Sequence, residues 1–326
     1  RSYTLSAPIL LYFLTILISL LTNVFRYPMH ELFVAALYAV RWLVFASVYF
    51  IIRGFEASFK EKLRVLLTIS GTFVVIFGFI QYIFYANLRN LYYLGWDEHL
   101  VRMFSTLLDP NFLGAFLVLF FLFLLGQIYE YFRHSGSAQN HFVLFRKTKL
   151  RDSGEVAASR NDGLKVLLLL ILTVFTFFAI FLTTSRSAFI MLLVSLITYF
   201  LLIGKKKWLL LFAVSISAIL IFSSRFFYIE NINPFRVASS LARVETGLNA
   251  VAIISKNPIF GVGFNAYRYA QYDYGFRTPQ TTYPNHADSG TDNSYLFVFA
   301  TSGIIGLLAY GYLLWSIYRM GETKLH

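Results

Sequence analysis

VLLLLILTVFTFFAIFLTTSRSAFIMLLVSLITYFLLI, residues 166–203, places this chain among membrane proteins. Two apolar runs are joined by a short polar connection that contains Arg186. Each run approaches the roughly 20 residues that cross a bilayer as a helix. Because the connection is short, Arg186 must stay at the membrane surface, where an arginine is costly enough to indicate a functional role. The stretch therefore predicts a helical membrane protein with a functional site at one membrane face.

The composition of the whole chain supports this interpretation. Of 326 residues, 58% are hydrophobic and only 13% are charged, whereas a soluble domain carries about 25% charged residues. The chain has no cysteine, which excludes disulfides, thiolate metal sites and thiol nucleophiles. The net charge of +12 accompanies no RNA- or DNA-binding motif, so we expect no nucleic-acid partner.

Eight apolar segments are predicted to cross the bilayer. They are Pro8–Phe25, Leu32–Ile52, Val65–Ala86, Phe112–Ile128, Val166–Thr184, Ala188–Ile203, Trp208–Phe222 and Tyr295–Ile317. None has the alternating pattern of a barrel strand, so we expect an all-α, polytopic membrane protein with about eight transmembrane helices. The chain begins at Arg1 without a methionine or a signal-peptide pattern, and we expect N-terminal residues to be missing.

The basic residues predict the orientation. Most of the 28 lysines and arginines fall on one side of the membrane when the connections alternate, and the positive-inside rule makes that side cytoplasmic. We therefore expect seven transmembrane helices within residues 1–222, with a cytoplasmic loop at 132–163. A large external loop follows at 223–293. Residues 294–326 then form the last transmembrane helix and a cytoplasmic tail.

Three arginines, Arg102, Arg186 and Arg243, fall on the external side in this topology. Guanidinium groups stay charged and form paired hydrogen bonds with phosphate. The three residues therefore indicate an anionic ligand at the external membrane face.

The external loop contains a predicted amphipathic helix. Apolar residues recur at helical spacing over Val237–Lys256, which is typical of a helix lying in the membrane interface. Ser239 or Ser240 is the candidate cap at its start, and Asn257-Pro258 is expected to end it. Beyond it, Gly261-Val262-Gly263 predicts a tight turn, since no Gly-Lys-Ser/Thr follows as in a phosphate-binding loop.

Tyrosines are frequent in the segment after this turn. Tyr267, Tyr272 and Tyr283 offer flat faces on which sugar rings can pack and hydroxyls that can hydrogen-bond them. An aromatic belt at the level of the lipid headgroups explains them equally well. Asp292 and Asn293 precede the last apolar segment, where either residue suits a helix N-cap.

Metal chemistry is not expected. None of the six histidines forms a His-x-x-x-His pair. The cluster Asp97-Glu98-His99 has the residue types of a cation site, although we favour a solvated loop there. Asp109-Pro110 reads as an N-cap followed by proline at the first helical position.

The order of several short motifs resembles a known family. They are Arg102-x-Phe104, Pro110-Asn111-x-x-Gly114, Ser185-Arg186-Ser187, Arg243, Asn257-Pro258-x-x-Gly261-x-Gly263, Asn293-Ser294-Tyr295-Leu296 and Ser302-Gly303-Ile304-Ile305-Gly306-Leu307. Over about Arg102 to Leu308 the chain is similar to the O-antigen ligase and O-antigen polymerase superfamily of bacterial membrane glycosyltransferases. No single motif is specific, and the resemblance depends on their order and on their shared side of the membrane.

This resemblance implies a fold of about twelve transmembrane helices with a large periplasmic loop, in the bacterial inner membrane with the active face outside. It implies transfer of a glycan from undecaprenyl diphosphate to a glycan or lipid acceptor, without metal, cofactor or nucleotide sugar. The functional arginines of the family correspond to Arg186 and Arg243, with Arg102 as a third. Family ligases carry a histidine where this chain has Asp292, so either Asp292 or the upstream His286 is the candidate catalytic base.

A transporter or flippase of the same lipid-linked glycans is the alternative. Such a protein needs charged or broken helices that meet at the membrane midplane, in two repeat-like halves. Arg41 and Gln81 are the candidates for such positions, and the sequence shows no repeat. We therefore favour a glycan ligase or polymerase, and the sequence leaves the choice between these two open.

Overall fold

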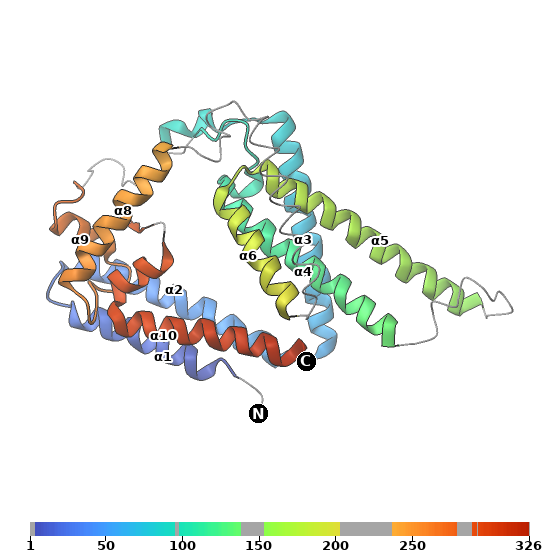
Figure 1. The fold of residues 1–326 in the computed structure, drawn as a ribbon, viewed down its shortest axis with the longest axis horizontal. Coiled ribbons are helices and arrows are strands. Elements are labelled where there is room, and N and C mark those ends of the chain that lie inside the picture. Colours follow the sequence, from blue (N-terminus) through green and yellow to red (C-terminus); the bar gives the residue numbers. More distant parts are fainter. Residues whose placement is uncertain are drawn as a thin grey trace. The chain divides into compact units, whose positions relative to one another are not determined.

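The computed structural model describes residues 4–94, 98–137, 153–202, 237–278, 289–291 and 293–325. Every regular element within these ranges is a helix (Figure 1). Five stretches are long and apolar enough to cross a membrane: Met29–Gly54 (α2), Ala57–Phe84 (α3), Pro110–Phe132 in α4, Gly163–Leu182 in α5 and Ser294–Glu322 in α10. The prediction of an all-helical, multi-pass membrane protein is confirmed.

The expected count of eight spans is supported only in part. Two more predicted segments form shorter apolar helices, Ser6–Thr22 (α1) and Arg186–Leu202 (α6). The predicted segment Trp208–Phe222 lies outside the described residues. Helix α4 extends over Pro110–Ser137 and α5 over Ser153–Leu182, so helix continues into both ends of the stretch expected to be a cytoplasmic loop.

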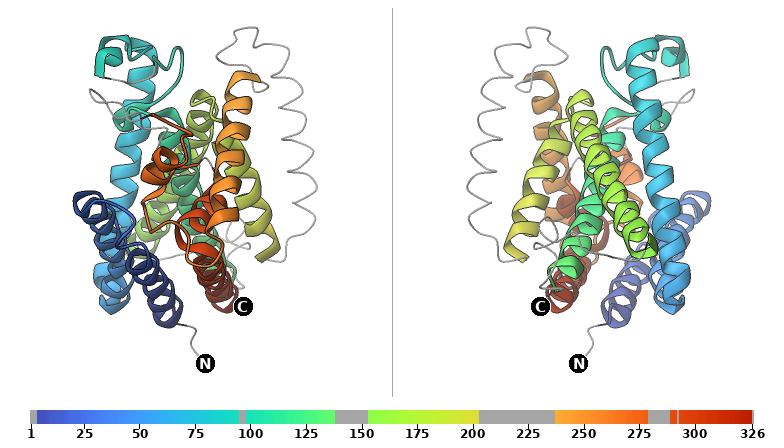
Figure 2. Two further views of the ribbon diagram at one scale, coloured as in Figure 1. Left: turned by 90° about the vertical axis from the view of Figure 1, so that its left-hand side faces the viewer. Right: turned by 90° about the vertical axis from the view of Figure 1, so that its right-hand side faces the viewer.

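The chain divides into two compact units. Arg1–Ala57 and Phe235–His326 form the first unit, and Ser58–Pro234 form the second. The first holds α1, α2, α8 (Val237–Lys256), α9 (Tyr267–Asp273) and α10 (Ser294–Leu325). The second holds α3, α4, α5, α6 and the short 3-10 helices η1 (Arg89–Leu94) and η2 (Ser105–Leu107). Figures 1 and 2 show α3, α4 and α5 as long rods.

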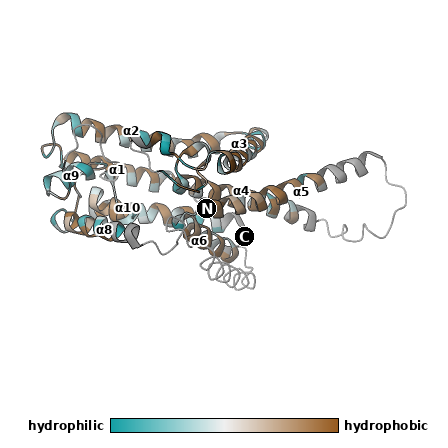
Figure 3. Cartoon of the chain, turned by 90° about the horizontal axis from the view of Figure 1, so that it is seen from above, coloured by the Kyte–Doolittle hydropathy of each residue, from teal (hydrophilic) through white to brown (hydrophobic). Residues whose placement is uncertain are grey.

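Hydrophobic residues predominate along these helices (Figure 3). In α2, for example, Ala35 and Ala39 are buried, while Phe33, Val44 and Phe45 are more than half exposed. A helix with apolar residues all around suits a surface of lipid rather than water.

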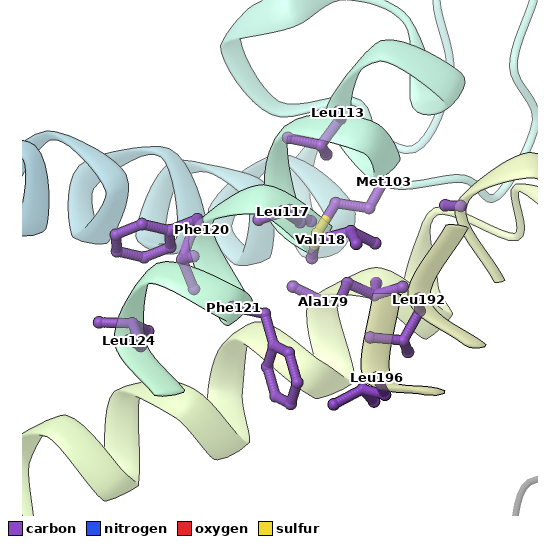
Figure 4. Close-up of a cluster of buried hydrophobic side chains, with 13 residues drawn as sticks. Met103, Leu113, Leu117, Val118, Phe120, Phe121, Leu124, Ala179, Leu192 and Leu196 are labelled. Carbon is purple, nitrogen blue, oxygen red and sulfur yellow. The ribbon is translucent and has the colours of Figure 1, made fainter. Parts of the chain in front are cut away.

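Helix α4 forms the centre of the second unit. Its residues Leu113, Leu117 and Leu124 are fully buried and pack with Ala179 of α5 and Leu192 of α6 (Figure 4). Packing of this kind replaces the hydrophobic driving force that is lacking between helices in lipid.

The last helix of the first unit is broken at Gly303. This residue has φ 66° and ψ −170°, which lies outside the helical region. The break frees backbone groups of α10, and the segment Pro258–Gly263 supplies their partners. Ile304 N donates to Pro258 O at 2.9 Å, and Val262 N donates to Ala300 O at 2.9 Å. Because lipid offers no hydrogen-bond partners, a break in a membrane helix needs this kind of compensation.

Two glycines allow this close approach. A Cβ atom on Gly303 would lie 2.0 Å from Ile259 O, and one on Gly261 would lie 2.4 Å from the carbonyl carbon of Thr301. Gly261 and Gly263 have φ of 70° and 105°, so the predicted tight turn is confirmed. The same loop is tied to α1, because Asn23 Nδ2 donates to Gly261 O at 3.1 Å.

Helix α8 has the bounds that the sequence predicts, Val237–Lys256. The predicted caps are wrong, because Ser239 and Ser240 lie inside the helix. Its buried face, which includes Ala250 and Ile253, packs in a cluster with α9 and α10. The apolar stripe of the predicted interfacial helix includes Val244, Leu248 and Val251, and these three residues are more than half exposed.

We expect Gly303→Ala and Gly261→Ala each to lower the free energy of unfolding by about 2–4 kcal/mol. At both positions φ is positive, and the methyl group of an alanine would lie against backbone atoms. Backbone atoms cannot move aside as a flexible side chain can. Thermal unfolding of the purified protein in detergent measures the effect. Gly311→Ala in the same helix is the control, since no atom lies within 4 Å of its added Cβ. Equal unfolding temperatures for the Gly303 and Gly311 variants would contradict the role of the break.

Candidate functional site

Arg102 lies in the connection between α3 and α4 and contacts the turn that precedes Arg186. Its Nε donates to Thr183 O at 3.0 Å and is 2.9 Å from Thr184 Oγ1. The neighbouring Met103 N donates to Leu182 O at 2.8 Å. The structure therefore brings Arg102 to the backbone that carries Arg186, which is the first residue of α6. Both arginines are half-buried.

The start of α6 is held against the start of α4. Ser185 Oγ donates to Asn111 Oδ1 at 2.8 Å and lies 3.1 Å from Ser187 Oγ. Gly114 permits the approach, because a Cβ atom there would lie 2.6 Å from Cβ of Ala188. Two of the short motifs of the sequence, around Asn111 and around Ser185, thus form one contact.

The positive charge at the starts of α4 and α6 favours the binding of an anion. A helix N-terminus carries about half a positive charge, and two such ends meet here beside Arg102 and Arg186. Asp109 neutralises part of this charge as the predicted N-cap of α4. Its Oδ1 accepts hydrogen bonds from Asn111 N at 2.6 Å and Phe112 N at 2.9 Å. The start of α6 has no acidic residue in its first turn.

Gln81 of α3 fixes the path of the chain on both sides of Arg102. Its amide nitrogen donates to Tyr85 O at 2.9 Å and to Arg102 O at 3.2 Å. Its amide oxygen accepts from Phe104 N at 2.8 Å and from Ser105 N at 3.1 Å. A glutamine has two donor hydrogens and two acceptor lone pairs, so these contacts use its full capacity. The sequence alone indicates Gln81 only as a candidate midplane position in the transporter alternative.

The backbone around Arg102 is strained. Val101, Ser105 and Leu108 have φ between 48° and 57°, and Thr184 opposite them has φ 47°. Left-handed backbone costs about 1–2 kcal/mol for a residue other than glycine, and a β-branched valine there is an outlier. Such conformations persist where surrounding contacts impose them, often at functional sites.

Arg243 belongs to the first unit. It lies on α8 and is exposed. Two residues along the same helix, Glu245 forms an ion pair with Arg277 at 3.7 Å. Tyr272, a predicted glycan-binding residue, lies on α9 and is half-buried. His286, Tyr283 and Asp292 lie outside the described residues.

The position of Tyr267 does not fit the glycan-binding role predicted for it. Its side chain is fully buried and packs against Phe297 with ring centroids 6.0 Å apart. Burial raises the pKa of Tyr267 to about 12. A ring enclosed in this way has no face open to a sugar, so Tyr267 belongs to the hydrophobic core. The spacing of tyrosines in the sequence gave no indication of which of them is covered.

Asn257, another motif residue, takes part in a polar cluster. Arg26 donates to Asn257 Oδ1 at 2.7 Å and to the Tyr274 hydroxyl at 3.0 Å, and Asn257 Nδ2 also donates to that hydroxyl at 2.9 Å. Burial acts to raise the pKa of Tyr274, but these hydrogen bonds and the charges of Arg26 and Lys256 outweigh it and lower the pKa. The cluster ties the connection between α1 and α2 to the end of α8.

Two further sequence expectations concern the ends of the loops. Asn293 Oδ1 accepts from Tyr295 N at 2.9 Å and Leu296 N at 3.2 Å, which confirms Asn293 as a cap of α10. In the cluster Asp97-Glu98-His99, Glu98 pairs with Arg89 at 3.3 Å, and Asp97 lies outside the described residues. Among the residues that the structure describes, no three histidines or acids are grouped as a metal site requires.

We expect Gln81→Leu to reduce the free energy of unfolding by about 2–4 kcal/mol, because two backbone amides of the Arg102 loop lose their acceptor. Hydrogen exchange should become faster at Phe104 and Ser105 in particular. Gln127→Leu is the matched control, since Gln127 is also half-buried and donates one hydrogen bond, to Thr68 at 3.1 Å. Unchanged exchange in the Gln81 variant would show that other contacts hold the loop.

Comparison with known proteins is consistent with this arrangement. No curated protein sequence and no solved structure matches the chain. Residues 171–311 match the family model described as O-antigen ligase. The matched residues include the Arg186 turn, α8, the loop Pro258–Gly263 and the break at Gly303. This multi-pass membrane protein therefore carries an O-antigen ligase family domain over residues 171–311.

Proposed function

We propose that this protein is a membrane glycosyltransferase that moves a glycan from undecaprenyl diphosphate to a glycan or lipid acceptor. The observation that carries the proposal is the contact of Arg102 with the Arg186 turn, because that turn lies within residues 171–311, which match the O-antigen ligase family. In this proposal the site faces the external side of a bacterial inner membrane, as the distribution of basic residues predicts.

The arginines suit the leaving group of this reaction. The diphosphate gains negative charge as the glycosidic C–O bond breaks. Arg186 and Arg102 keep their charge at any working pH and offer paired hydrogen bonds to phosphate. In this proposal Arg243 of α8 is the third diphosphate-binding residue. Loss of one such contact in a partly dehydrated site costs roughly 3 kcal/mol in the transition state, on the order of a hundredfold in rate.

The acceptor needs a base. Its hydroxyl oxygen attacks the anomeric carbon, the diphosphate departs with the electron pair of the broken bond, and His286 or Asp292 accepts the hydroxyl proton. Direct displacement inverts the configuration at the anomeric carbon. Tyr272 and Tyr283 are the proposed platforms for the sugar rings. The proposed reaction uses no metal, cofactor or nucleotide sugar.

The broken helix α10 is the feature that a transporter would share. In transporters, half-helix ends and unwound carbonyls bind the cargo. Here the segment Pro258–Gly263 hydrogen-bonds to the backbone on both sides of Gly303, so those groups are used within the protein. The side chain of Arg41 lies over the rings of Tyr38 and Phe45 on its own helix, at 5.9 and 5.6 Å. These observations favour the enzyme over the flippase.

We expect Arg186→Ala and Arg243→Ala each to slow glycan transfer about a hundredfold or more while the protein still inserts and folds. Transfer is measured with purified protein in proteoliposomes, an undecaprenyl-diphosphate glycan and candidate acceptors. Arg89→Ala is the control, because the Arg89 side chain is 63% exposed and pairs with Glu98. Normal transfer by either of the first two variants would remove the basis for the diphosphate site.

The products of the same assay distinguish the activities. A ladder of growing chains on the lipid indicates a polymerase, and one block transferred to another molecule indicates a ligase. No glycosidic bond with any of several donors would support the flippase instead.

We expect a chelator such as EDTA to leave the rate unchanged, since the proposed charge stabilisation comes from arginines. Inhibition that a divalent cation reverses would contradict this and direct attention to the Glu98 region.

A further inference from the structure

The second unit contains a large apolar groove between α3 and α5, with α4 as its floor at one end. Its volume is about 1150 Å³, above the roughly 300–1,000 Å³ of most small-molecule sites. Side chains such as Val75, Ile76, Leu169 and Leu172 line it. All of the lining residues belong to this one unit.

The shape of the groove follows from how α3 packs. Gly71 of α3 lies so close to Phe120 of α4 that a Cβ atom would come within 2.2 Å of the ring. Farther along α3, Phe79 meets Phe175 of α5 with ring centroids 5.7 Å apart. From this contact α5 diverges from α3 toward its own N-terminal end (Figure 1). The helices α3 and α5 are therefore closer together near Phe79 than near Arg64, and the lining residues on α3 continue past Phe79 to Phe84.

The wide end carries four charged side chains. Arg64 lies 2.6 Å from Glu61 on α3 and 2.6 Å from Glu130 on α4, and Lys165 of α5 completes the lining. These residues lie within about two turns of the ends of three membrane spans, so they are level with lipid headgroups. Two positive and two negative groups therefore surround the mouth of an apolar groove.

The groove is long enough to cover one leaflet. Its lining on α3 extends from Glu61 to Phe84, and the stretch from Arg64 to Ile76 alone covers about 18 Å of helix, while the hydrocarbon of one leaflet is about 15 Å thick. An acyl chain that enters at the charged mouth and extends to Ile76 therefore ends near the middle of the bilayer.

We propose that this groove binds one glycerophospholipid whose headgroup carries both a phosphate and a primary ammonium group, that is, a phosphatidylethanolamine. The phosphate lies near Arg64 and Lys165, and the ammonium near Glu61 and Glu130, while one acyl chain lies along Ile76. Arg64 already pairs with both carboxylates, so a phosphate that binds Arg64 competes with them unless the headgroup also supplies an ammonium group. Such a site goes beyond the proposed glycan transfer and is independent of it.

The headgroup is tested by native mass spectrometry. Delipidated full-length protein is titrated with phosphatidylethanolamine or phosphatidylglycerol that carry the same acyl chains. We expect phosphatidylethanolamine to bind roughly fivefold more tightly, and a Glu61→Gln, Glu130→Gln double variant to lose this preference. Equal binding of the two lipids by the unchanged protein would overturn the proposal.

The groove itself is tested with two matched substitutions. Ile76 and Phe77 are both 48% exposed, and only Ile76 is among the lining residues. Ile76→Trp should weaken phosphatidylethanolamine binding about tenfold by filling the groove, whereas Phe77→Trp should bind as the unchanged protein does. Equal effects of both variants would overturn the proposal. Displacement of the phospholipid by a polyprenyl diphosphate would also overturn it, because the groove would then hold a donor tail.

Lipid binding is measured without glycan transfer. A protein that transfers glycan but shows no preference for phosphatidylethanolamine would contradict only the lipid site, and the reverse result would contradict only the proposed enzyme.

Discussion

Hydrogen bonding of the backbone freed at Gly303 is the constraint on which the first unit depends. A broken helix in lipid must find internal partners, and here they come from the loop Pro258–Gly263, which precedes α10. The loop can reach α10 only because Gly261 and Gly303 lack side chains. The same contact positions the end of α8 and, through Asn23, the end of α1. The close approach of the loop Pro258–Gly263 to α10 therefore positions α1, α8 and α10 together.

In the second unit, the side chain of Gln81 satisfies backbone groups of a strained connection. The connection that carries Arg102 has a strained path, and Gln81 satisfies its backbone on both sides. Arg102 in turn hydrogen-bonds to the turn before Arg186. A polar residue in an apolar span is costly unless all of its hydrogen bonds are made, and Gln81 makes all of them. The rigidity of this arrangement suits a site that must hold phosphate-binding groups in place.

Much of the local structure was predictable, because caps, turns and helix periods depend on neighbouring residues. The bounds of α8, the turn at Gly261 and the caps Asp109 and Asn293 follow from such patterns. Which face of α8 is covered did not follow, since periodicity identifies an apolar stripe but not its partner. The burial of Tyr267 did not follow either, because its partner Phe297 lies 30 residues away in the sequence. The hydrogen bonds of Gln81 to the Arg102 loop likewise depend on how that loop folds back onto α3.

The packing of α1 against α10 has a consequence for the order of assembly. Ser19 donates a hydrogen bond to Thr301 O across 282 residues of sequence. The loop Pro258–Gly263, in contrast, precedes α10 by a few tens of residues. During synthesis α1 therefore stays in the bilayer without this contact until α10 has been inserted, while the break in α10 can meet its partner soon after it is made. Contacts between distant parts of a chain form late, so the packing of α1 against α10 is expected to form after the contact at Gly303.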